Sequence, residues 1–372
     1  MQWGQNMSIR DSEAKVSKSP HKNNLNQSDE LITIDLFSGS GAVTAALKEA
    51  GFQVAVALDN DATACKTYRL NHQEVDLRET DICAVSVKDL PRIPNISLLV
   101  VCAPCQPFSL QNQKRNKDPR SKLVLQSVKF ITEFSPNLVF FENVPGLASS
   151  PEFRKLKRLL SPIGYKLTRV RLFDAADFGV PQRRKRCVVM ASKSKSAIKL
   201  FNSFTPPGIK ATVFDAIGKL PVLKSGEQDS QDALHKARQH KPIVLERLQH
   251  IPKDGGSRSS LPEHLQLDCH KRMGETQTYS DVYGRMKWND VAPTLTTGCT
   301  DVTKGRFVHP DQNRAITLRE AALLQGFPLK YKFSGNSSSI ARQIGNAVPL
   351  GLVTQLAPLM KNMISLAKGD IS

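Results

Sequence analysis

The sequence predicts an α/β protein with a mostly parallel sheet, followed by a smaller and less regular region. Four short runs rich in Val, Leu, Ile and Phe have the length and composition of buried parallel strands; they cover residues 31–37, 54–58, 98–103 and 137–144. A glycine-containing loop and an Ala/Leu-rich helical stretch follow the first run. A chain of 372 residues is also long enough for one large domain and a smaller one.

The composition indicates a polyanionic partner. Lys and Arg number 52 against 34 Asp and Glu, which gives a formal charge of +18, and nucleic acid is the first candidate. Seven cysteines, an odd number, argue against a disulfide framework and for a reducing compartment. The sequence has no apolar run of membrane-spanning length and no signal-peptide pattern at its start. We therefore expect a cytoplasmic or nucleoid-associated protein.

Residues 1–30 are polar, rich in Ser, Asn, Gln and Lys, and show no hydrophobic periodicity. Such a segment cannot bury enough surface to offset the entropy that ordering it would cost. The sequence therefore predicts a disordered leader, with the folded part beginning near Leu31.

The loop Ser38-Gly39-Ser40-Gly41 follows the first strand, and its glycines let the backbone approach a ligand closely. It lacks the third glycine of the G-x-G-x-x-G motif, so a plain tight connection is the alternative. Asp59 ends the second strand about twenty residues later, where a carboxylate can accept hydrogen bonds from both ribose hydroxyls. These features favour a nucleoside-bearing cofactor. Asp81 and Ile82 follow the third strand, in position for an adenine contact, although Asp81 also suits a turn.

Cys105 follows Pro104, directly after the apolar run of residues 98–103. Reactive groups of open α/β sheets lie beyond the carboxyl ends of such strands, so Cys105 is a candidate nucleophile. A small buried hydrophobe is the simplest alternative, and Cys102 and Cys105 also form a C-x-x-C pair typical of redox sites or half of a zinc site. The other five cysteines form no second pair, which makes zinc improbable and leaves the redox alternative open.

Glu142 follows the apolar residues 138–141 of the fourth run, and it either lies in solvent or faces Cys105 across neighbouring strand ends. The cations of Gln182-Arg183-Arg184-Lys185-Arg186 precede another strand, at 187–191, and either bind an anion or base or form a solvated loop. Residues 111–120 are polar and basic and predict a mobile loop before a helix over 121–134.

The hydrophobic pattern weakens from Ser192 to about Asn313, which predicts a smaller, irregular domain. His264, Cys269 and His270 in this segment match no usual metal-ligand spacing, and we expect no metal. Residues 317–328 predict a helix with a Thr-x-x-Glu capping box at its start. Residues 343–349 precede a final apolar helix, which we expect to run through Met360.

The order of these motifs resembles that of the cytosine-5 DNA methyltransferases. The matching stretches, in chain order, are D-L-F-S-G-S-G, the acid Asp59, A-P-C-Q-P-F-S, F-E-N-V, Q-R-R-K-R, L-R-E-A-A-L-L-Q-G-F-P and Q-I-G-N-A-V-P. They run from about Leu31 to Met360, with a variable basic region between the fifth and the sixth. A redox site would explain none of the other six stretches, so the resemblance favours a nucleophilic Cys105.

The resemblance implies a Rossmann-like, S-adenosylmethionine-dependent methyltransferase domain over 31–191, completed by 340–372, and a small, irregular target-recognition domain over 192–339. It places S-adenosylmethionine against Phe37, Gly39, Asp59, Asp81, Ile82, Pro104 and Asn346. It implies double-stranded DNA as substrate for a monomeric enzyme. A restriction endonuclease would be the further partner if the enzyme belongs to a restriction-modification system.

The resemblance also implies that Cys105 adds to C6 of a flipped cytosine, while Glu142 holds the ring nitrogen and the exocyclic amine. Arg184 and Arg186 would contact the base oxygen or fix neighbouring groups. Asn143 would orient the loop that carries the nucleophile.

The sequence departs from the family pattern at two positions: Cys102 stands where relatives commonly carry glycine, and Asp59 where many carry glutamate. Neither change removes a required chemical group. An RNA cytosine-5 methyltransferase would share Cys105 and Glu142, whereas a non-catalytic nucleic-acid binder would lack them. The long basic segment between residues 186 and 317 favours DNA over RNA.

Overall fold

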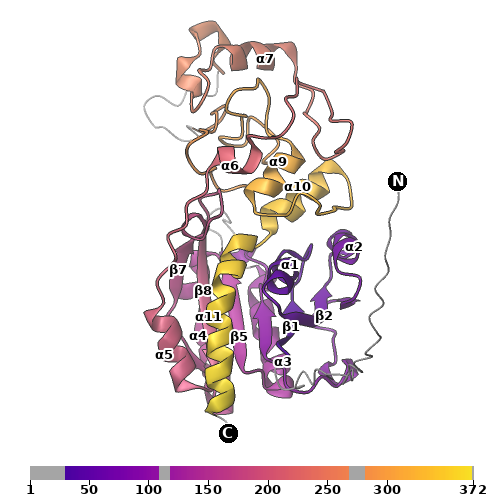
Figure 1. Cartoon of the computed structure of the whole chain (residues 1–372), viewed down its shortest axis with the longest axis vertical. Coiled ribbons are helices and arrows are strands. Elements are labelled where there is room, and N and C mark those ends of the chain that lie inside the picture. The colour runs from indigo at the N-terminus through magenta and orange to yellow at the C-terminus, as the bar shows by residue number, and fades with distance from the viewer. Residues whose placement is uncertain (1–29, 109–117, 268–280, 371–372) are drawn as a thin grey trace, which may run out of the picture. The chain divides into compact units, whose positions relative to one another are not determined.

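A computed structural model describes residues 30–108, 118–267 and 281–370. The predicted leader, most of the predicted basic loop of residues 111–120, Cys269 and His270 lie outside the described residues. The chain from Leu31 to Ser372 forms one compact unit (Figure 1). None of the helices within the described ranges has the length and apolar character that crossing a bilayer requires.

The centre of this unit is a mixed eight-stranded sheet. Its strands are β1 (Ile32–Leu36), β2 (Gln53–Asp59), β3 (Asp76–Glu79), β4 (Leu98–Val101), β5 (Leu138–Asn143), β6 (Lys166–Leu167), β7 (Arg171–Asp174) and β8 (Lys185–Ser192). The order is β3-β2-β1-β4-β5-β8-β6, and β7 also pairs with β8. Strands β1 to β5 are parallel, as predicted, whereas β8 runs antiparallel to β5, β6 and β7.

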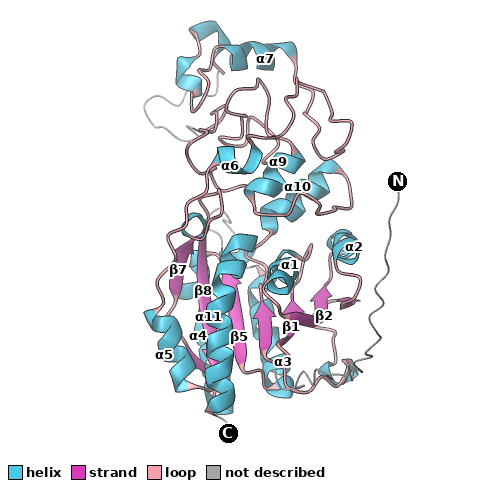
Figure 2. Ribbon diagram, in the orientation of Figure 1, coloured by secondary structure: helices cyan, strands magenta, loops and turns pink. Residues whose placement is uncertain are grey.

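Helices cover both faces of the sheet. Because the central strands are therefore buried on both faces, their sequences are continuous apolar runs. On β4, Leu98 and Val100 pack into one core, while Leu99 and Val101 pack into the other. The first core is closed by α1 (Ala42–Glu49), α5 (Lys195–Ser203) and α11 (Leu350–Gly369), and the second by α3 (Ser127–Phe134) and α4 (Pro151–Leu160). Helix α2 (Ala62–Asn71) packs beside β2 and β3. Figure 2 shows α11 crossing the sheet next to α5.

Two predicted boundaries differ from the structure. Helix α11 continues past Met360 to Gly369, because the buried Met363, Ile364 and Ala367 extend its apolar stripe. The predicted helix over 121–134 begins as a 3₁₀ helix over Pro119–Gln126 and becomes α-helical only in α3. The other 3₁₀ helices in the described residues are Val87–Asp89, Gln106–Phe108, Pro145–Ser149, Ser161–Ile163, Ala175–Asp177, Arg258–Ser260 and Glu263–Leu265.

The segment after α5 is irregular, as the weak pattern predicts. It contains the short helices α6 (Val213–Ile217), α7 (Pro242–Gln249), α9 (Leu318–Leu324) and α10 (Ser337–Asn346), and isolated bridges in place of strands. Its small core includes Leu248, Tyr283 and Val308. Helix α5 itself packs on β8 and α11 through Ala197 and Phe201, so the sheet layer continues past residue 192.

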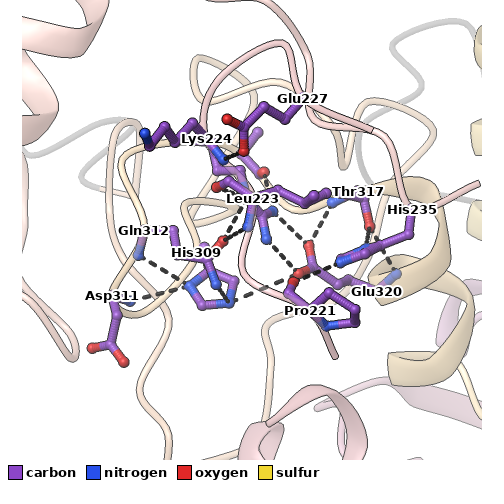
Figure 3. A network of polar contacts seen from close by, with 12 residues as sticks. Pro221, Leu223, Lys224, Glu227, His235, His309, Asp311, Gln312, Thr317 and Glu320 are labelled. Atoms are coloured by element: carbon purple, nitrogen blue, oxygen red, sulfur yellow. Dashed lines mark hydrogen bonds and ion pairs between the residues drawn. The ribbon is translucent and has the colours of Figure 1, made fainter. Parts of the chain in front are cut away.

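A buried polar network supports this irregular segment (Figure 3). Arg314 donates to both carboxylate oxygens of Glu320 at 2.8 and 2.7 Å, and both side chains are almost fully buried. Glu320 also accepts from the backbone N–H of Thr317, which completes the predicted capping box at the start of α9. His235 contacts the Thr317 hydroxyl at 3.0 Å and the Pro221 carbonyl at 2.9 Å. Side-chain hydrogen bonds, and not strand pairing, thus connect α9 to the loops around Pro221 and His235.

Asp35 is a fully buried carboxyl on β1 whose ionisation opposes folding. Thr44 donates to its Oδ2 at 2.8 Å, and its Oδ1 has no hydrogen-bond partner among the described residues. Burial raises the pKa of Asp35 from 3.8 to about 7. Between these values the unfolded chain ionises at this position and the folded chain does not, so stability falls as pH rises.

We predict that the free energy of unfolding of Asp35→Asn increases, relative to that of the native chain, as pH rises from 5 to 8. The unpaired amide that this change leaves costs about 1–3 kcal/mol, but this cost does not depend on pH. The pH-dependent gain should be on the order of 1 kcal/mol or more, measured by urea unfolding at both pH values. The exposed Asp89→Asn controls for net charge. If the stability difference between Asp35→Asn and the native chain were the same at pH 5 and pH 8, ionisation of the buried Asp35 would not oppose folding.

Candidate active site

A cavity of about 690 Å³ lies at the carboxyl ends of β1, β2, β4 and β5. Ten of the residues predicted from the sequence line it: Phe37, Gly39, Asp59, Asp81, Ile82, Pro104, Cys105, Glu142, Arg186 and Asn346. Two others, Asn143 and Arg184, lie behind its wall. The cavity therefore joins the predicted cofactor residues and the predicted nucleophile in one space.

The glycine loop and Asp59 are held together directly. The Gly39 N–H donates to Oδ2 of Asp59 at 2.8 Å, and the Asp61 N–H donates to Oδ1 at 2.8 Å. Phe37 adopts φ 61° and Gly39 φ 54°, so the chain turns sharply where it leaves β1. A left-handed Phe is strained, and such strain is concentrated at functional sites. Burial raises the pKa of Asp59, although the two backbone donors partly offset this effect.

The residues around the glycine loop and Asp59 fit a ligand with a ribose and a polar tail. Ser38 Oγ and Gln343 Oε1 are buried in the cavity wall and have no hydrogen-bond partner in the part of the chain that the structure describes. Buried polar atoms are normally hydrogen-bonded, so a bound polar ligand would satisfy them. The Asp59 carboxylate can still accept further hydrogen bonds, and Ile82 and Val348 offer apolar contacts for a planar base.

The loop after β3 forms a neighbouring wall. Asp81 accepts a hydrogen bond from the Cys83 N–H at 2.8 Å, so it stabilises a turn, which was one of the two roles that the sequence suggested. Asp81 also lines the cavity. Lys129 donates to the carbonyls of Ile82 and Val85 at 2.6 and 2.7 Å. An ammonium group between two carbonyls holds this loop against α3.

Glu142 and Cys105 meet because β4 and β5 are adjacent and parallel. Val101 pairs with Phe141, which places Glu142 beside the loop that carries Cys105. Glu142 forms a buried ion pair with Arg186, whose Nε lies 2.8 Å from Oε1. Burial raises the pKa of Glu142, and Arg186 and Arg184 partly offset this effect. Burial and then Glu142 raise the pKa of the Cys105 thiol, again against the two arginines.

The loop that carries Cys105 is fixed from β5. Asn143 donates from Nδ2 to the Ala103 carbonyl at 2.9 Å, and its Oδ1 accepts from the Val144 N–H. A Cβ on Gly146 would lie only 2.1 Å from the Phe108 carbonyl oxygen, so glycine is required where these two loops touch. Asn143 thus contacts the loop that carries Cys105, and its role in orienting that loop stays a prediction.

Arg184 bonds to the protein backbone and does not line the cavity. Its guanidinium donates to the carbonyls of Leu295 at 2.9 Å and Gly345 at 2.6 Å. Burial, and then Arg186, lowers its pKa to about 9. Of the two expected roles, contact with a base oxygen or fixing neighbouring groups, these hydrogen bonds favour the second. Arg184 thus supports the last turn of α10, next to Asn346.

The sequence analysis missed Arg120 and Gln343 as cavity residues. Arg120 belongs to the basic stretch after Cys105 and pairs with Asp118 at 2.7 Å. Gln343 opens the Q-I-G-N-A-V-P motif, which precedes the final helix α11, as predicted, and whose first four residues form the last turn of α10. The six cysteines in the described ranges carry free thiols. In those ranges, no group of three or more His, Cys, Asp or Glu is arranged to hold a metal ion.

Comparisons with known proteins identify the family of this chain. The family model described as C-5 cytosine-specific DNA methylase matches residues 31–362. The Type II methylase M.HgiDII of Herpetosiphon aurantiacus is 37% identical over 342 residues, which cover 89% of this chain and 95% of the relative. The Type II methyltransferase M.PspPI of Psychrobacter sp. (strain TA137) is 30% identical over 349 residues, which cover 91% of this chain and 80% of the relative.

The solved structure of a DNA modification methyltransferase encoded within an E. coli prophage is also similar. It has a TM-score of 0.69 and 24% identity and covers 90% of this chain and 100% of its own. This likeness confirms the predicted Rossmann-like α/β methyltransferase fold. The family match over most of the chain, together with the two relatives, establishes that this protein belongs to the C-5 cytosine-specific DNA methylase family and is a DNA cytosine-5 methyltransferase.

Proposed function

We propose that this enzyme uses S-adenosylmethionine to methylate C5 of a flipped cytosine in double-stranded DNA, with Cys105 as nucleophile. One observation carries the proposal: the glycine loop and Asp59 line one part of a single cavity, and the Cys105 thiol and the Glu142 carboxyl line another part of it. S-adenosylmethionine supplies an electrophilic methyl group on a sulfonium. The residues expected to hold it are Phe37, Gly39, Asp59, Asp81, Ile82, Pro104 and Asn346.

Cys105 solves the chemical problem of the substrate, because C5 of cytosine is a poor nucleophile. The thiolate adds to C6, and the electron pair of the C5–C6 double bond becomes available at C5 for attack on the methyl group. Loss of the proton from C5 then expels the thiolate and restores the ring. The base must leave the helix to reach Cys105, at a cost of about a few kcal/mol.

Glu142 stabilises the charge that develops on the ring as sulfur adds. The raised pKa of Glu142 lets this carboxyl hold a proton for the ring nitrogen, and Arg186 orients it. Glu142 also raises the pKa of the Cys105 thiol by repulsion, so a proton on Glu142 favours the Cys105 thiolate. The two groups are therefore suited to opposite protonation states, with Cys105 ionised and Glu142 neutral.

The irregular segment that follows α5 and extends to residue 339 is proposed to read the DNA sequence. Lys236, Lys253, Lys287 and Lys304 in this segment are exposed and suit phosphate contacts. We propose that the enzyme acts as a monomer on DNA of the nucleoid. The Type II names of its relatives favour a restriction-modification system with an endonuclease partner.

We predict that Cys105 forms a covalent adduct with duplex DNA carrying 5-fluorocytosine at the target. Fluorine at C5 cannot leave as a cation, so the bond from sulfur to C6 persists after methyl transfer. A denaturing gel should show a shifted band with the native enzyme and none with Cys105→Ala. Cys83→Ser, which changes an exposed thiol of the same cavity, should still form the adduct. An adduct that persists in Cys105→Ala would reject Cys105 as the nucleophile.

We predict that Glu142→Gln lowers turnover by about two or more orders of magnitude, the usual scale for lost acid-base assistance. Cofactor affinity should stay within about threefold, because Glu142 lies at the nucleophile end of the cavity. Single-turnover methylation and calorimetric cofactor binding measure the two quantities. Glu79→Gln is the matched control, since Glu79 ends β3 but pairs with Arg69 outside the cavity. Equal losses of affinity and turnover would contradict this role.

We predict that the segment after α5 determines the target sequence. Residues 205–290 can be exchanged for those of a relative with a different target, which leaves the contacts of Ala292 and Leu295 with the sheet domain in place. Conversion sequencing of DNA from cells expressing the hybrid should show methylation at the donor's site. An active hybrid that keeps the original target would contradict the assignment.

A further inference from the structure

Two side chains outside the cavity contact the glycine loop from behind. His72 follows α2, and Tyr331 follows α9, 291 residues after Ser40. Neither lines the 690 Å³ cavity, but both contact the backbone that forms its wall. The mechanism proposed above uses neither of them.

The hydrogen bonds end on consecutive carbonyls of the loop. The Tyr331 hydroxyl donates to the Ser40 carbonyl at 2.6 Å. His72 Nε2 lies 3.1 Å from the Gly41 carbonyl oxygen and 3.2 Å from the Tyr331 hydroxyl. Because a carbonyl can only accept, Nε2 of His72 carries the hydrogen and donates to both.

Burial holds His72 in this neutral form. Its side chain is almost fully buried, and burial, followed by repulsion from Lys48, lowers its pKa to about 4. Its Nδ1 has no hydrogen-bond partner in the described ranges. An imidazole with its hydrogen on Nε2 and a free lone pair on Nδ1 accounts for all of these contacts.

Packing leaves the loop no room to move toward this pair. Gly41 adopts φ 89°, and a Cβ there would lie 2.6 Å from Cδ2 of His72 and 2.9 Å from the Tyr331 hydroxyl. These distances are shorter than van der Waals contact. Gly41, the N-cap residue of α1, therefore packs directly against the two side chains.

Tyr331 is itself anchored to α2. Asn71 and Lys332 exchange two hydrogen bonds, at 2.9 and 3.0 Å, and the Ser334 N–H donates to Thr67 Oγ1 at 2.8 Å. The Tyr331 ring also packs on Phe327 and Phe333. The hydroxyl is thus a fixed donor, and its position depends on a segment far away in the chain.

We infer that His72 and Tyr331 are positioning residues that set the glycine loop for cofactor binding. By holding the Ser40 and Gly41 carbonyls, they keep the Gly39 N–H on Asp59 and the Ser38 hydroxyl in the cavity wall. Loss of either donor frees the loop, so the ligand must order it on binding and binds more weakly. This inference rests on the proposed function, which assigns the loop to S-adenosylmethionine.

Tyr331→Phe tests the inference with S-adenosylhomocysteine as the probe, titrated by calorimetry into the full chain. The dissociation constant should rise about 3- to 10-fold, the scale of one buried hydrogen bond. Turnover at saturating cofactor should stay within about twofold, while the KM for S-adenosylmethionine rises with the dissociation constant. Amide exchange at residues 38–41 should quicken.

Tyr165→Phe is the matched control. The Tyr165 hydroxyl is equally buried and donates to the Pro136 carbonyl at 2.7 Å, at the opposite end of β5 from the cavity. Both substitutions should lower the melting temperature, but only Tyr331→Phe should weaken ligand binding. Equal affinities in the two variants would overturn the positioning role. If the native chain itself fails to bind S-adenosylhomocysteine, the proposed function fails instead.

A second pair of variants decides the case if Tyr331→Phe does not fold. His72→Gln keeps an N–H donor near the Gly41 carbonyl, whereas His72→Leu removes it. The dissociation constant should be clearly lower for His72→Gln than for His72→Leu. Equal dissociation constants for these two variants would overturn the role of the His72 hydrogen bond.

Discussion

The parallel register between β4 and β5 is the constraint on which this active site depends. Both strands are buried on both faces, so a shift of one residue would turn every apolar side chain to the wrong core. The pairing of Val101 with Phe141 therefore sets where each strand ends. This register brings Cys105 and Glu142 to the lining of one cavity.

This proximity creates the electrostatic character of the site. Burial raises the pKa of both the Cys105 thiol and the Glu142 carboxyl, and the charge of Glu142 raises the pKa of Cys105 further. Arg186, from the antiparallel strand β8, supplies the compensating charge by its ion pair with Glu142. The reversal of β8 thus has a chemical consequence, because it brings a cation to the carboxyl end of a parallel strand.

The C-terminal part of the chain completes the part of the cavity around the glycine loop and Asp59. Arg184 fixes the end of α10 through the Gly345 carbonyl, and Gln343 and Asn346 of that helix line the cavity. Tyr331 holds the glycine loop from outside. Hydrogen bonds to backbone carbonyls therefore connect the C-terminal part of the chain to the strands and loops of the sheet.

The sequence by itself determined the features that depend on local chemistry. Apolar runs predicted strands β1, β2, β4 and β5, and the Thr-x-x-Glu pattern predicted the start of α9. Cys105, Glu142 and Asp59 could be selected because each lies at or just beyond the carboxyl end of a buried strand, and these ends share one edge of a parallel sheet. Their roles in catalysis and cofactor binding stay predictions.

Only the tertiary structure decided the features that depend on distant partners. Nothing local to Arg184 indicates that its guanidinium bonds to the Leu295 and Gly345 carbonyls. The antiparallel direction of β8 likewise depends on the connection through β6 and β7, which have no strong pattern. Tyr331 and His72 carry no motif, yet they meet at the glycine loop across 259 residues. Hydrogen bonds to backbone carbonyls leave no signature in the sequence, because every residue offers the same acceptor.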